Sequence, residues 1–528
     1  MSHKISFFDE QPNGVLPLEQ VAIRLQPDVD NVAIAKRPLQ AGTTLQLNGT
    51  QIMLRQFVPD GHKIALQPAR RGDPVRRYGQ IIGFATEDIT PGDHVHSHNM
   101  GVQEFDRDYA FGVDVRPVDY VPADQRRTFM GYKRANGRVG TRNYIGVIST
   151  VNCSAHVTRE IAHYFTPEKL AVYPNIDGVI PLAHLFGCAV QIGGEDYALL
   201  QRTLAGMANH ANIGAYIIVG LGCETNQTAD LIANYGLEHG FMSAPPPNLT
   251  IQGTGGTRKT IEAGIEAVEE LLPLVNQITR TPQPASELMV ALQCGGSDSW
   301  SGVTANPLLG IAADEIVRQG GTAVLAETPE IYGAEHLLTR RAANREVGEK
   351  LVALVRWWED HTRLHKIEID NNPSVGNKLG GLTTIYEKSL GAVAKGGTTP
   401  LTGVYHYAEP VTARGFTFMD SPGYDPVSVT GQVAGGCNLV VFTTGRGSAF
   451  GFKPAPSIKI ATNSTMYEHM VEDMDINAGQ IMDGVPMQQV ADELVDLMLA
   501  VASVQKSRSE AQGIGEHEFN PWNLGGIL

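Results

Sequence analysis

Residues 144–153 read YIGVISTVNC, and this stretch decides the kind of fold to expect. It is a run of apolar, largely β-branched residues that ends in a short polar turn carrying Cys153. Runs of this kind are typical of strands buried on both faces of a parallel sheet. In open α/β sheets, ligands bind outside the carboxyl ends of such strands. The stretch therefore predicts an α/β fold with Cys153 at the edge of the sheet where chemistry takes place.

Three further cysteines end comparable segments, which are HLFGC at 184–188, YIIVGLGC at 216–223 and MVALQCGG at 289–296. We expect Cys188 and Cys223 to share a site with Cys153. Cys294 is expected to be a neighbour whose CGGSD turn shapes the pocket. The alternative for each is simple packing, because free cysteine is among the most buried residue types. Packing is also the expected role of Cys437, which precedes a strand.

Outward from these segments, the chain divides into parts with different hydrophobic patterns. Short alternating segments separated by turn signals predict a small all-β domain within residues 1–105. A polar stretch at 106–130, with scattered aromatic residues and prolines, is expected to be a linker. Strands then alternate with amphipathic helices. We predict two α/β units with mostly parallel sheets, at 131–285 and 286–528.

Within the α/β part, the patterns also place individual elements. Strands are expected at 144–150, 215–221, 288–293, 322–326 and 439–444. Helices are expected at 155–165, 258–279, 334–366 and 487–503. Most strands are therefore followed by a helix, which is the arrangement that makes a parallel sheet.

The 528-residue chain is 42% hydrophobic and 18% charged, which is typical of a globular protein. Its net charge of −15 argues against a nucleic-acid or anionic-membrane partner, which would need a basic face. Its five scattered cysteines give no disulfide framework, and their odd number fits a reducing compartment. There is no signal-peptide pattern and no apolar stretch of about eighteen residues. We expect a cytoplasmic protein that acts on a small molecule, and we expect it to form a homo-oligomer.

A series of ordered motifs runs through the chain. They include DNVAIA at 30–35, GHKIAL at 61–66, RYGQIIG at 77–83, GDHVHSHN at 92–99, YKRANGRVGTRN at 132–143, QCGGSDSWSGVTANP at 293–307, NPSVGNKLGGLTT at 372–384, TTGRGSAFG at 443–451 and MDINAG at 474–479. With these motifs the chain resembles the altronate/galactarate dehydratase family, and its N-terminal part is similar to that family's β-clip (SAF) domain. The resemblance implies dehydration of a sugar acid to a 2-keto-3-deoxy acid, assisted by Fe(II) or another divalent metal.

Two segments bear on the choice of substrate. HVHSHN at 94–99 and GLGCETNQ at 220–227 look more like the altronate type than the galactarate type. We therefore expect a hexonate of the D-altronate type, with galactarate as the alternative. Two further hypotheses remain, a sulfolactate-type lyase and a non-catalytic sugar-acid binding protein.

The implied reaction removes a proton alpha to a carboxylate and expels a β-hydroxyl. It needs a base, an electrophile for the developing enediolate, and acid help for the leaving group. Thiolates of Cys153, Cys188 and Cys223 would suit iron, zinc or an iron–sulfur cluster. The alternating histidines of HVHSHN are a second set of metal candidates. On a strand they would share one face, where His96 is the ligand candidate unless that face is merely exposed and polar.

Four residues are candidates for catalysis. His62 and Lys63, in PDGHK, could act as general base or as carboxylate anchor, or could be ordinary turn residues. His184 stands four residues before Cys188 and could be a base, a ligand or a structural histidine. Asp298, in CGGSD, is a candidate at the edge of the sheet, with capping of a helix N-terminus as the alternative.

Five residues are candidates for binding the substrate. Arg446 lies between glycines after a buried strand, where a guanidinium and backbone amides can hold a carboxylate. Asn306 is expected at the same edge. Lys378 lies in a glycine-rich segment and is either a carboxylate ligand or a solvated lysine. Arg142 and Asn143 precede a strand, so they stand at its opposite end, and the resemblance is what makes them candidates.

Overall fold

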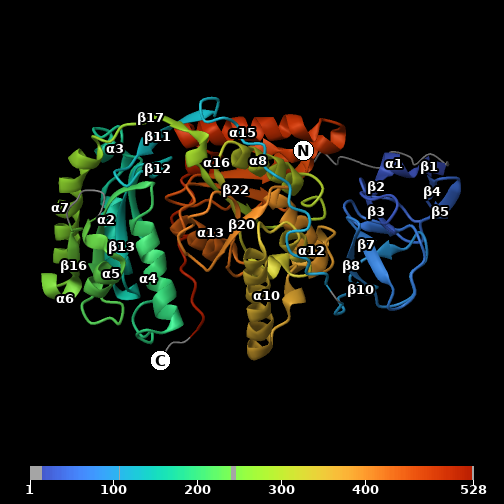
Figure 1. The fold of residues 1–528 in the computed structure, drawn as a ribbon, viewed down its shortest axis with the longest axis horizontal. Coiled ribbons are helices and arrows are strands. Elements are labelled where there is room, and N and C mark those ends of the chain that lie inside the picture. The colour runs from blue at the N-terminus through green and yellow to red at the C-terminus, as the bar shows by residue number, and fades with distance from the viewer. Residues whose placement is uncertain (1–14, 106, 240–244, 526–528) are drawn as a thin grey trace, which may run out of the picture. The chain divides into compact units, whose positions relative to one another are not determined.

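The computed structural model describes residues 15–105, 107–239 and 245–525. The chain divides into two compact units (Figure 1). The first unit combines the N-terminal part of the chain with a later segment, Ile369–Leu390, and the second unit contains the rest. In the described part of the chain, no helix is both long and apolar enough to cross a membrane.

The first unit consists of short strands in three small sheets, with the orders β1-β4-β5, β2-β3-β6-β9 and β10-β8-β7. Leu39, Leu45, Val58 and Ile64 belong to its small, solvent-excluded core. The elements are β1 Val15–Pro17, α1 Leu18–Val21, β2 Ala22–Ile23, β3 Val32–Ala35, β4 Thr44–Leu47, β5 Thr50–Met53, β6 Lys63–Ala65, β7 Pro74–Arg77, β8 Gln80–Ala85, β9 His94–Val95 and β10 Met100–Gly101. The later segment adds α11 Val375–Leu379 and the start of α12 Ile385–Val393.

A buried ion network ties this later segment to the strands of the first unit. Nζ of Lys63 lies 2.9 Å from Oε2 of Glu387, and Nη1 of Arg77 lies 2.7 Å from Oε1 of the same carboxylate. All three side chains are at most 1% exposed. Burial alone would raise the pKa of Glu387, but Lys63 and Arg77 outweigh it and lower this pKa to about 2. One carboxylate therefore compensates two buried cations.

The second unit begins with a four-stranded parallel sheet of order β14-β13-β15-β16. Its strands are β13 Tyr144–Ser149, β14 Gly178–Leu182, β15 Ile213–Gly220 and β16 Asn248–Thr250. The helices around it are α2 Ala155–Tyr164, α3 Pro167–Leu170, α4 Glu195–Ala208, α5 Thr228–Tyr235, α6 Ile251–Thr254 and α7 Thr257–Val275. Side chains of α2 and α7 cover one face, where Val157, Ile161 and Val268 pack on β13 and β15.

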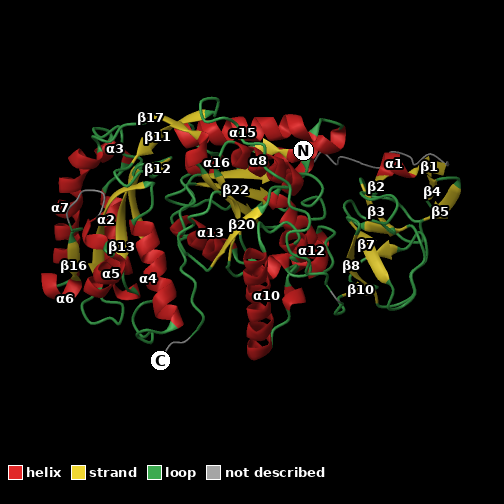
Figure 2. Ribbon diagram, in the orientation of Figure 1, coloured by secondary structure: helices red, strands yellow, loops and turns green. Residues whose placement is uncertain are grey.

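The rest of the second unit is organised on a seven-stranded parallel sheet of order β20-β21-β19-β18-β22-β23-β24 (Figure 2). Its strands are β18 Met289–Cys294, β19 Thr322–Leu325, β20 Leu401–Tyr405, β21 Gly415–Met419, β22 Leu439–Thr444, β23 Ser457–Ala461 and β24 Ile476–Asn477. Its helices are α8 Ala305–Arg318, α9 His336–Thr339, α10 Arg345–His365, α13 Asp425–Ala434, α14 Ser464–His469, α15 Met487–Ser503 and α16 Arg508–Ala511.

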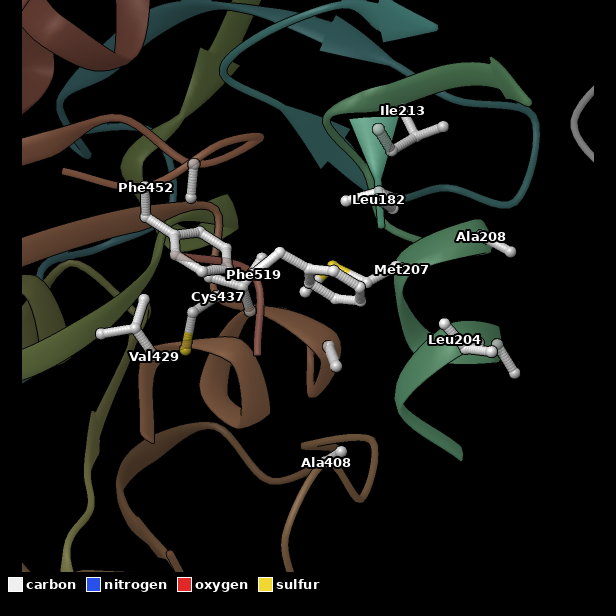
Figure 3. Packing of buried hydrophobic residues seen from close by; sticks show 14 of the residues in the cluster. Leu182, Leu204, Met207, Ala208, Ile213, Ala408, Val429, Cys437, Phe452 and Phe519 are labelled. Carbon is white, nitrogen blue, oxygen red and sulfur yellow. The ribbon is translucent and has the colours of Figure 1, made fainter. Parts of the chain in front are cut away.

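The two parallel sheets share one hydrophobic core. Residues of α4 and the first sheet, including Leu204 and Met207, belong to the same buried cluster as Val429, Phe452 and Phe519 from the second part (Figure 3). The helices α4 and α13 approach closely, because a Cβ at Gly206 would lie 2.4 Å from the carbonyl oxygen of Ala434. Glycine is therefore required at this crossing.

The predicted fold class is confirmed: a strand-rich N-terminal domain precedes α/β regions with parallel sheets. The strand expected at 439–444 and the helix expected at 487–503 have the predicted bounds. The helical block expected at 334–366 is interrupted, because Asn344 caps α10 by accepting a hydrogen bond from the Val347 amide. β11 Thr128–Lys133 begins inside the stretch expected as a linker and forms a small antiparallel sheet with β12 Val139–Gly140 and β17 Thr281–Pro284.

We predict that Glu387→Gln lowers the free energy of unfolding by about 3–5 kcal/mol, because it leaves two buried cations without a counter-charge. Urea denaturation followed by circular dichroism would measure the loss. Glu349→Gln, which removes only an exposed ion pair with Arg345, is the matched control and should cost less than ~1 kcal/mol. Equal effects of the two substitutions would contradict the prediction.

Candidate active site

The carboxyl ends of β18, β19 and β22 lie at one edge of the seven-stranded sheet, because these strands are parallel neighbours. β18 ends at Cys294, which pairs with Thr443 of β22. β19 ends at Leu325, shortly before Glu327. Ligand sites of open α/β sheets lie at this kind of edge.

Four buried ionisable side chains meet there. Sγ of Cys294 is 2.9 Å from Nζ of Lys395 and 3.9 Å from Oε2 of Glu330. Nζ of Lys395 is also 4.0 Å from Oε2 of Glu327. One ligand atom each from Cys294, Glu327 and Glu330 lies within 4.8 Å of the others, and among the described residues no further group of His, Cys, Asp or Glu does so.

Short helical turns place these side chains. Glu330 lies in the 3₁₀ helix η4, Thr328–Ile331, and Lys395 lies in η6, Ala394–Gly396. Glu327 precedes η4 with a φ of +73°, a left-handed conformation that costs a non-glycine residue about 1–3 kcal/mol. Strain of this kind persists only where surrounding structure holds it, and it clusters at functional sites.

The electrostatics of the group fit a bound cation. Burial lowers the pKa of Lys395, but Cys294, Glu327 and Glu330 outweigh it, so the pKa of this ammonium is raised. A thiolate and two carboxylates are ligands that borderline divalent ions such as Fe²⁺ and Zn²⁺ accept. The donor set is compatible with the divalent metal expected from the sequence.

Asp298 lies at the same edge and is buried. Its carboxylate accepts hydrogen bonds from the amide and hydroxyl of Ser301, from the hydroxyl of Thr462 and from the side-chain amide of Asn463. Burial raises its pKa despite these bonds. The contacts join the loops that follow β18 and β23, which favours a positioning role. Its catalytic role stays a prediction.

Arg446 and Asn306 differ in what their side chains can still bind. The amide of Arg446 donates to the carbonyl of Gly296 at 2.8 Å, while its exposed guanidinium makes no hydrogen bond or ion pair with a described residue. Asn306 is buried, donates to the Gly391 carbonyl at 2.9 Å and accepts from the Thr443 hydroxyl at 2.6 Å. Arg446 is therefore free to hold a substrate anion, whereas Asn306 is occupied within the protein.

Cys153, Cys188 and Cys223 follow strands of the four-stranded sheet, whereas Cys294 ends a strand of the seven-stranded sheet. All three are exposed and reduced. Cys153 lies in the 3₁₀ helix η1, Asn152–Ser154, directly after β13. The three sulfurs do not all lie within 4.8 Å of one another, so the cysteines are not grouped as the ligands around Cys294 are.

His184 lies beside the first of these loops but is engaged within the protein. Its Nε2 is 2.9 Å from the carbonyl oxygen of Ser149, and its Nδ1 accepts from the amide of Phe186 at 3.1 Å. Burial lowers its pKa to about 4. Both nitrogens of this neutral ring hold the HLFGC loop in place, and a role as base or ligand stays a prediction.

In the first unit, four histidines gather. The ring centroid of His62 is 5.0 Å from those of His94 and His96, and His94 is 5.5 Å from His96 and from His98. The strand expected across HVHSHN ends at Val95, and a turn brings the later rings back. The histidines are therefore clustered, although not by strand alternation.

Backbone carbonyls of α11 orient two of these rings. Nε2 of His96 is 2.9 Å from the carbonyl oxygen of Lys378, and Nε2 of His62 is 3.3 Å from that of Leu379. Nδ1 of His62 then accepts from Nε2 of His94 at 2.9 Å. Burial lowers the pKa of His96 to about 4 and that of His94 to about 3. The His94 and His96 rings are therefore neutral at pH 7, and His96 as a metal ligand stays a prediction.

The two candidate lysines of the first unit have different environments. Nζ of Lys63 donates to Glu387 and, at 2.7 Å, to the Gly381 carbonyl, so it is held in the ion network. Burial lowers its pKa to about 8 although Glu387 opposes this shift. Lys378 is half-buried on α11, and its carbonyl oxygen accepts a hydrogen bond from His96. This arrangement does not test Lys63 as a general base or carboxylate anchor, nor Lys378 as a carboxylate ligand, and these roles stay predictions.

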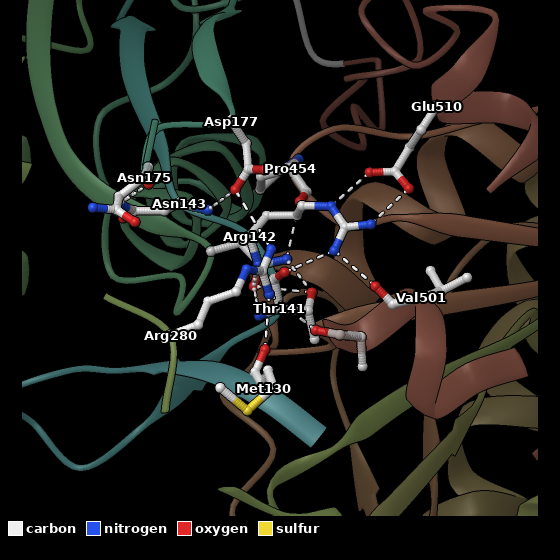
Figure 4. A network of polar contacts seen from close by, with 12 residues as sticks. Met130, Thr141, Arg142, Asn143, Asn175, Asp177, Arg280, Pro454, Val501 and Glu510 are labelled. Atoms are coloured by element: carbon white, nitrogen blue, oxygen red, sulfur yellow. Dashed lines mark hydrogen bonds and ion pairs between the residues drawn. The ribbon is translucent and has the colours of Figure 1, made fainter. Parts of the chain in front are cut away.

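Arg142 and Asn143 precede β13, whereas Cys153 follows it, and Figure 4 shows the polar contacts of the two residues. The guanidinium of Arg142 binds both carboxylate oxygens of Glu510, each at 2.7 Å. The side chain of Asn143 accepts from Arg134 at 2.8 Å and donates to the carbonyl of Asn175 at 2.7 Å. Both are buried and join parts of the second unit, so the structure does not bring them to the other candidates.

Three family models match consecutive parts of the chain: the altronate/galactarate dehydratase SAF domain at 20–103, the D-galactarate dehydratase/altronate hydrolase second domain at 131–276, and the D-galactarate/altronate dehydratase C-terminal domain at 285–527. Altronate dehydratase of Bacillus subtilis is 36% identical over 92% of this chain and 96% of its own length. The chain belongs to the altronate/galactarate dehydratase family. It is an enzyme of the hydro-lyase class, and the resemblance seen in the sequence is confirmed.

Two more relatives mark the breadth of the family. Galactarate dehydratase (L-threo-forming) of Escherichia coli is 36% identical over 94% of this chain and 96% of its own length. The β-subunit of (2R)-sulfolactate sulfo-lyase from Chromohalobacter salexigens is 33% identical over 74% of this chain and 96% of its own length. Identity alone therefore does not choose the substrate of this dehydratase.

The sequence reasoning missed Glu327, Glu330 and Lys395. Each lies in or beside a short helical turn without a recognisable motif, and Lys395 is far from the two glutamates in the chain. The segment LAETPE, at 325–330, could have indicated the two glutamates. It follows a buried strand and contains two acidic residues three positions apart. Cys294, expected only as a neighbour, is a member of the group.

We predict that the protein loses stability as the pH falls from about 6.5 towards 4. His94 and His96 have folded pKa values of about 3 and 4, below their ordinary 6.5, so the unfolded chain binds protons first. Thermal midpoints measured across this range should fall less steeply in a His94→Gln, His96→Gln double variant than in wild type. His469→Gln, at an exposed histidine, should leave the slope unchanged. Parallel profiles for wild type and the double variant would refute this assignment.

Proposed function

We propose that this protein is a metal-dependent dehydratase that converts a sugar acid of the D-altronate type to a 2-keto-3-deoxy acid and water. The observation that carries the proposal is the buried group of Cys294, Glu327, Glu330 and Lys395 at the carboxyl edge of the seven-stranded sheet. It combines a donor set for a cation with an amine that can carry a proton. The five free thiols favour a reducing compartment, which supports a cytoplasmic location.

The residues of the group would divide the reaction between them. Cys294, Glu327 and Glu330 would hold the metal, which when bound supplies an electrophile for the substrate carboxylate and a hydroxyl. The free guanidinium of Arg446, on the neighbouring strand end, would bind and orient that carboxylate. Water is excluded from the group by burial, which strengthens these charge interactions.

Lys395 is our candidate for the base that removes the alpha proton. Its raised pKa depends on the acidic groups around it. Neutralising those charges would lower the pKa of Lys395 and free its amine to take up a proton at Nζ. The same ammonium could then return a proton to the leaving hydroxyl.

The altronate type is favoured by the motifs HVHSHN and GLGCETNQ, and galactarate is the alternative. To test the substrate, purified protein would be loaded anaerobically with Fe(II) and incubated with a panel of aldonates and aldarates. We expect 2-keto acid to form fastest from altronate. Preference for galactarate would select the alternative, release of sulfite from sulfolactate would select the lyase reading, and no turnover of any hydroxy acid would refute the proposal.

We predict that Glu330→Gln lowers both metal affinity and turnover by about 100-fold, because it removes one charged ligand. Metal content after dialysis and the initial rate with saturating substrate would measure the two effects. Glu349→Gln should change neither, since this glutamate is exposed on α10. Full metal loading and full activity in Glu330→Gln would exclude this site as the metal centre.

We predict that Arg446→Ala raises KM for the sugar acid by about 10–100-fold, because a charge-assisted contact with the carboxylate is lost. Since the guanidinium is exposed, the fold should be unaffected. Arg258→Ala, at another exposed arginine, serves as the control. An unchanged KM would remove Arg446 from the substrate site.

A further inference from the structure

We propose that a cavity at the amino edge of the seven-stranded sheet binds a small carboxylate of about three carbons. The cavity lies within the second unit and has a volume of about 150 Å³. No residue of the group around Cys294 lines it, so the inference does not rest on the proposed function. It comes from the position of the cavity, from the charges at its opening and from its size.

The starts of four parallel strands define where the cavity lies. Met289 and Thr322, the first residues of β18 and β19, both line it. Arg414 and Asn438, which directly precede β21 and β22, line it as well. Cys294, in the proposed metal site, ends β18 instead. Because these strands are parallel, the cavity and the proposed metal site lie at opposite edges of one sheet.

Apolar side chains from separate segments wall the cavity. Val139, Ala211 and Val411 line it and are each at most 6% exposed. Asn438 holds the wall together, because its side-chain amide donates to the carbonyls of Val139 and Glu287, each at 3.0 Å. Pockets for small molecules are mostly apolar and preformed, with a few polar groups that orient the ligand. These walls therefore match a short carbon chain rather than a bare inorganic ion.

Two guanidiniums supply positive charge at the opening. Arg138 and Arg414 line the cavity and are exposed, so the opening lies beside them. The guanidinium of Arg138 donates one long hydrogen bond, at 3.5 Å to the carbonyl of Asn209, and makes no other hydrogen bond or ion pair with a described residue. Arg414 binds Glu287 at 3.3 Å and the carbonyl of Ser286. Two arginines and one glutamate leave a net positive charge, which favours a carboxylate.

A buried hydroxyl adds a donor without a partner. Thr322 is fully buried, and its Oγ1 has no hydrogen-bond partner among the described residues. Buried polar groups are nearly always hydrogen-bonded, because leaving one without a partner is costly. Since Thr322 lines the cavity, an acceptor oxygen bound there would supply the missing partner.

The volume limits the size of the ligand. A cavity of roughly this volume holds a molecule the size of benzene, which has ~6 non-hydrogen atoms. Pyruvate and lactate have the same number of such atoms, whereas a hexonate has about twice as many. The cavity therefore suits a short keto or hydroxy acid, and it differs from the proposed substrate site in its ligand as well as in its position.

Calorimetric titration and thermal unfolding at constant ionic strength would test the site. Full-length protein would be titrated with pyruvate and with lactate, with lactamide as the neutral control and inorganic phosphate as the bare anion. We expect both acids to bind and to raise the thermal midpoint, and lactamide to bind at least about tenfold more weakly, because it lacks the charge. Absence of binding by both acids would overturn the site, and tighter binding of phosphate would overturn the assignment to a carboxylate.

Variants tie the binding to this cavity. Arg138→Ala should weaken lactate binding by about tenfold, because a charge-assisted contact is lost. Thr322→Val should raise the thermal midpoint of the free protein, since it removes an unpaired buried hydroxyl, and should reduce the shift that lactate causes. Arg446→Ala and Arg258→Ala should bind lactate as wild type does, which separates this cavity from the proposed substrate site. Unchanged binding in Arg138→Ala, or loss of binding in Arg446→Ala, would overturn the inference.

Discussion

The close crossing of α4 over α13 constrains the whole second unit. At this crossing a Cβ on Gly206 would lie 2.4 Å from the Ala434 carbonyl, so the helices meet backbone to backbone. Because both helices belong to one core, the two parallel sheets cannot shift independently without opening it. The loops at both carboxyl edges are consequently carried by one packed core, which favours precise placement of ligands.

Both units bury a group of charged side chains, but the two groups differ in composition. In the first unit Glu387 faces Lys63 and Arg77, and its carboxylate is completed by protein donors, among them the amide and hydroxyl of Thr383. Around Lys395 the balance is reversed, because one ammonium faces a thiol and two carboxylic acids. The first network is closed by protein donors, whereas the second brings together a thiol and two carboxylic acids, a donor set that a divalent cation accepts.

What the sequence could predict depends on the range of the interaction. Hydrophobic runs predicted the strands β13, β15, β18 and β22, because a strand that is buried on both faces has a local run of apolar residues. The meeting of Cys294 with Lys395 could not be read in this way, because it depends on segments about a hundred residues apart. For the same reason the sequence did not reveal that the guanidinium of Arg142 binds Glu510 near the C-terminus.

The two candidate metal sites of the second unit differ in chemistry and in access. Cys294 with two carboxylates offers mixed, partly hard ligands in a buried setting, whereas Cys153, Cys188 and Cys223 offer soft ligands at the surface. Soft thiolates select iron–sulfur centres, and carboxylates favour single divalent ions with open positions. Since ligand type and spacing both differ, the two sites would not compete for the same form of iron.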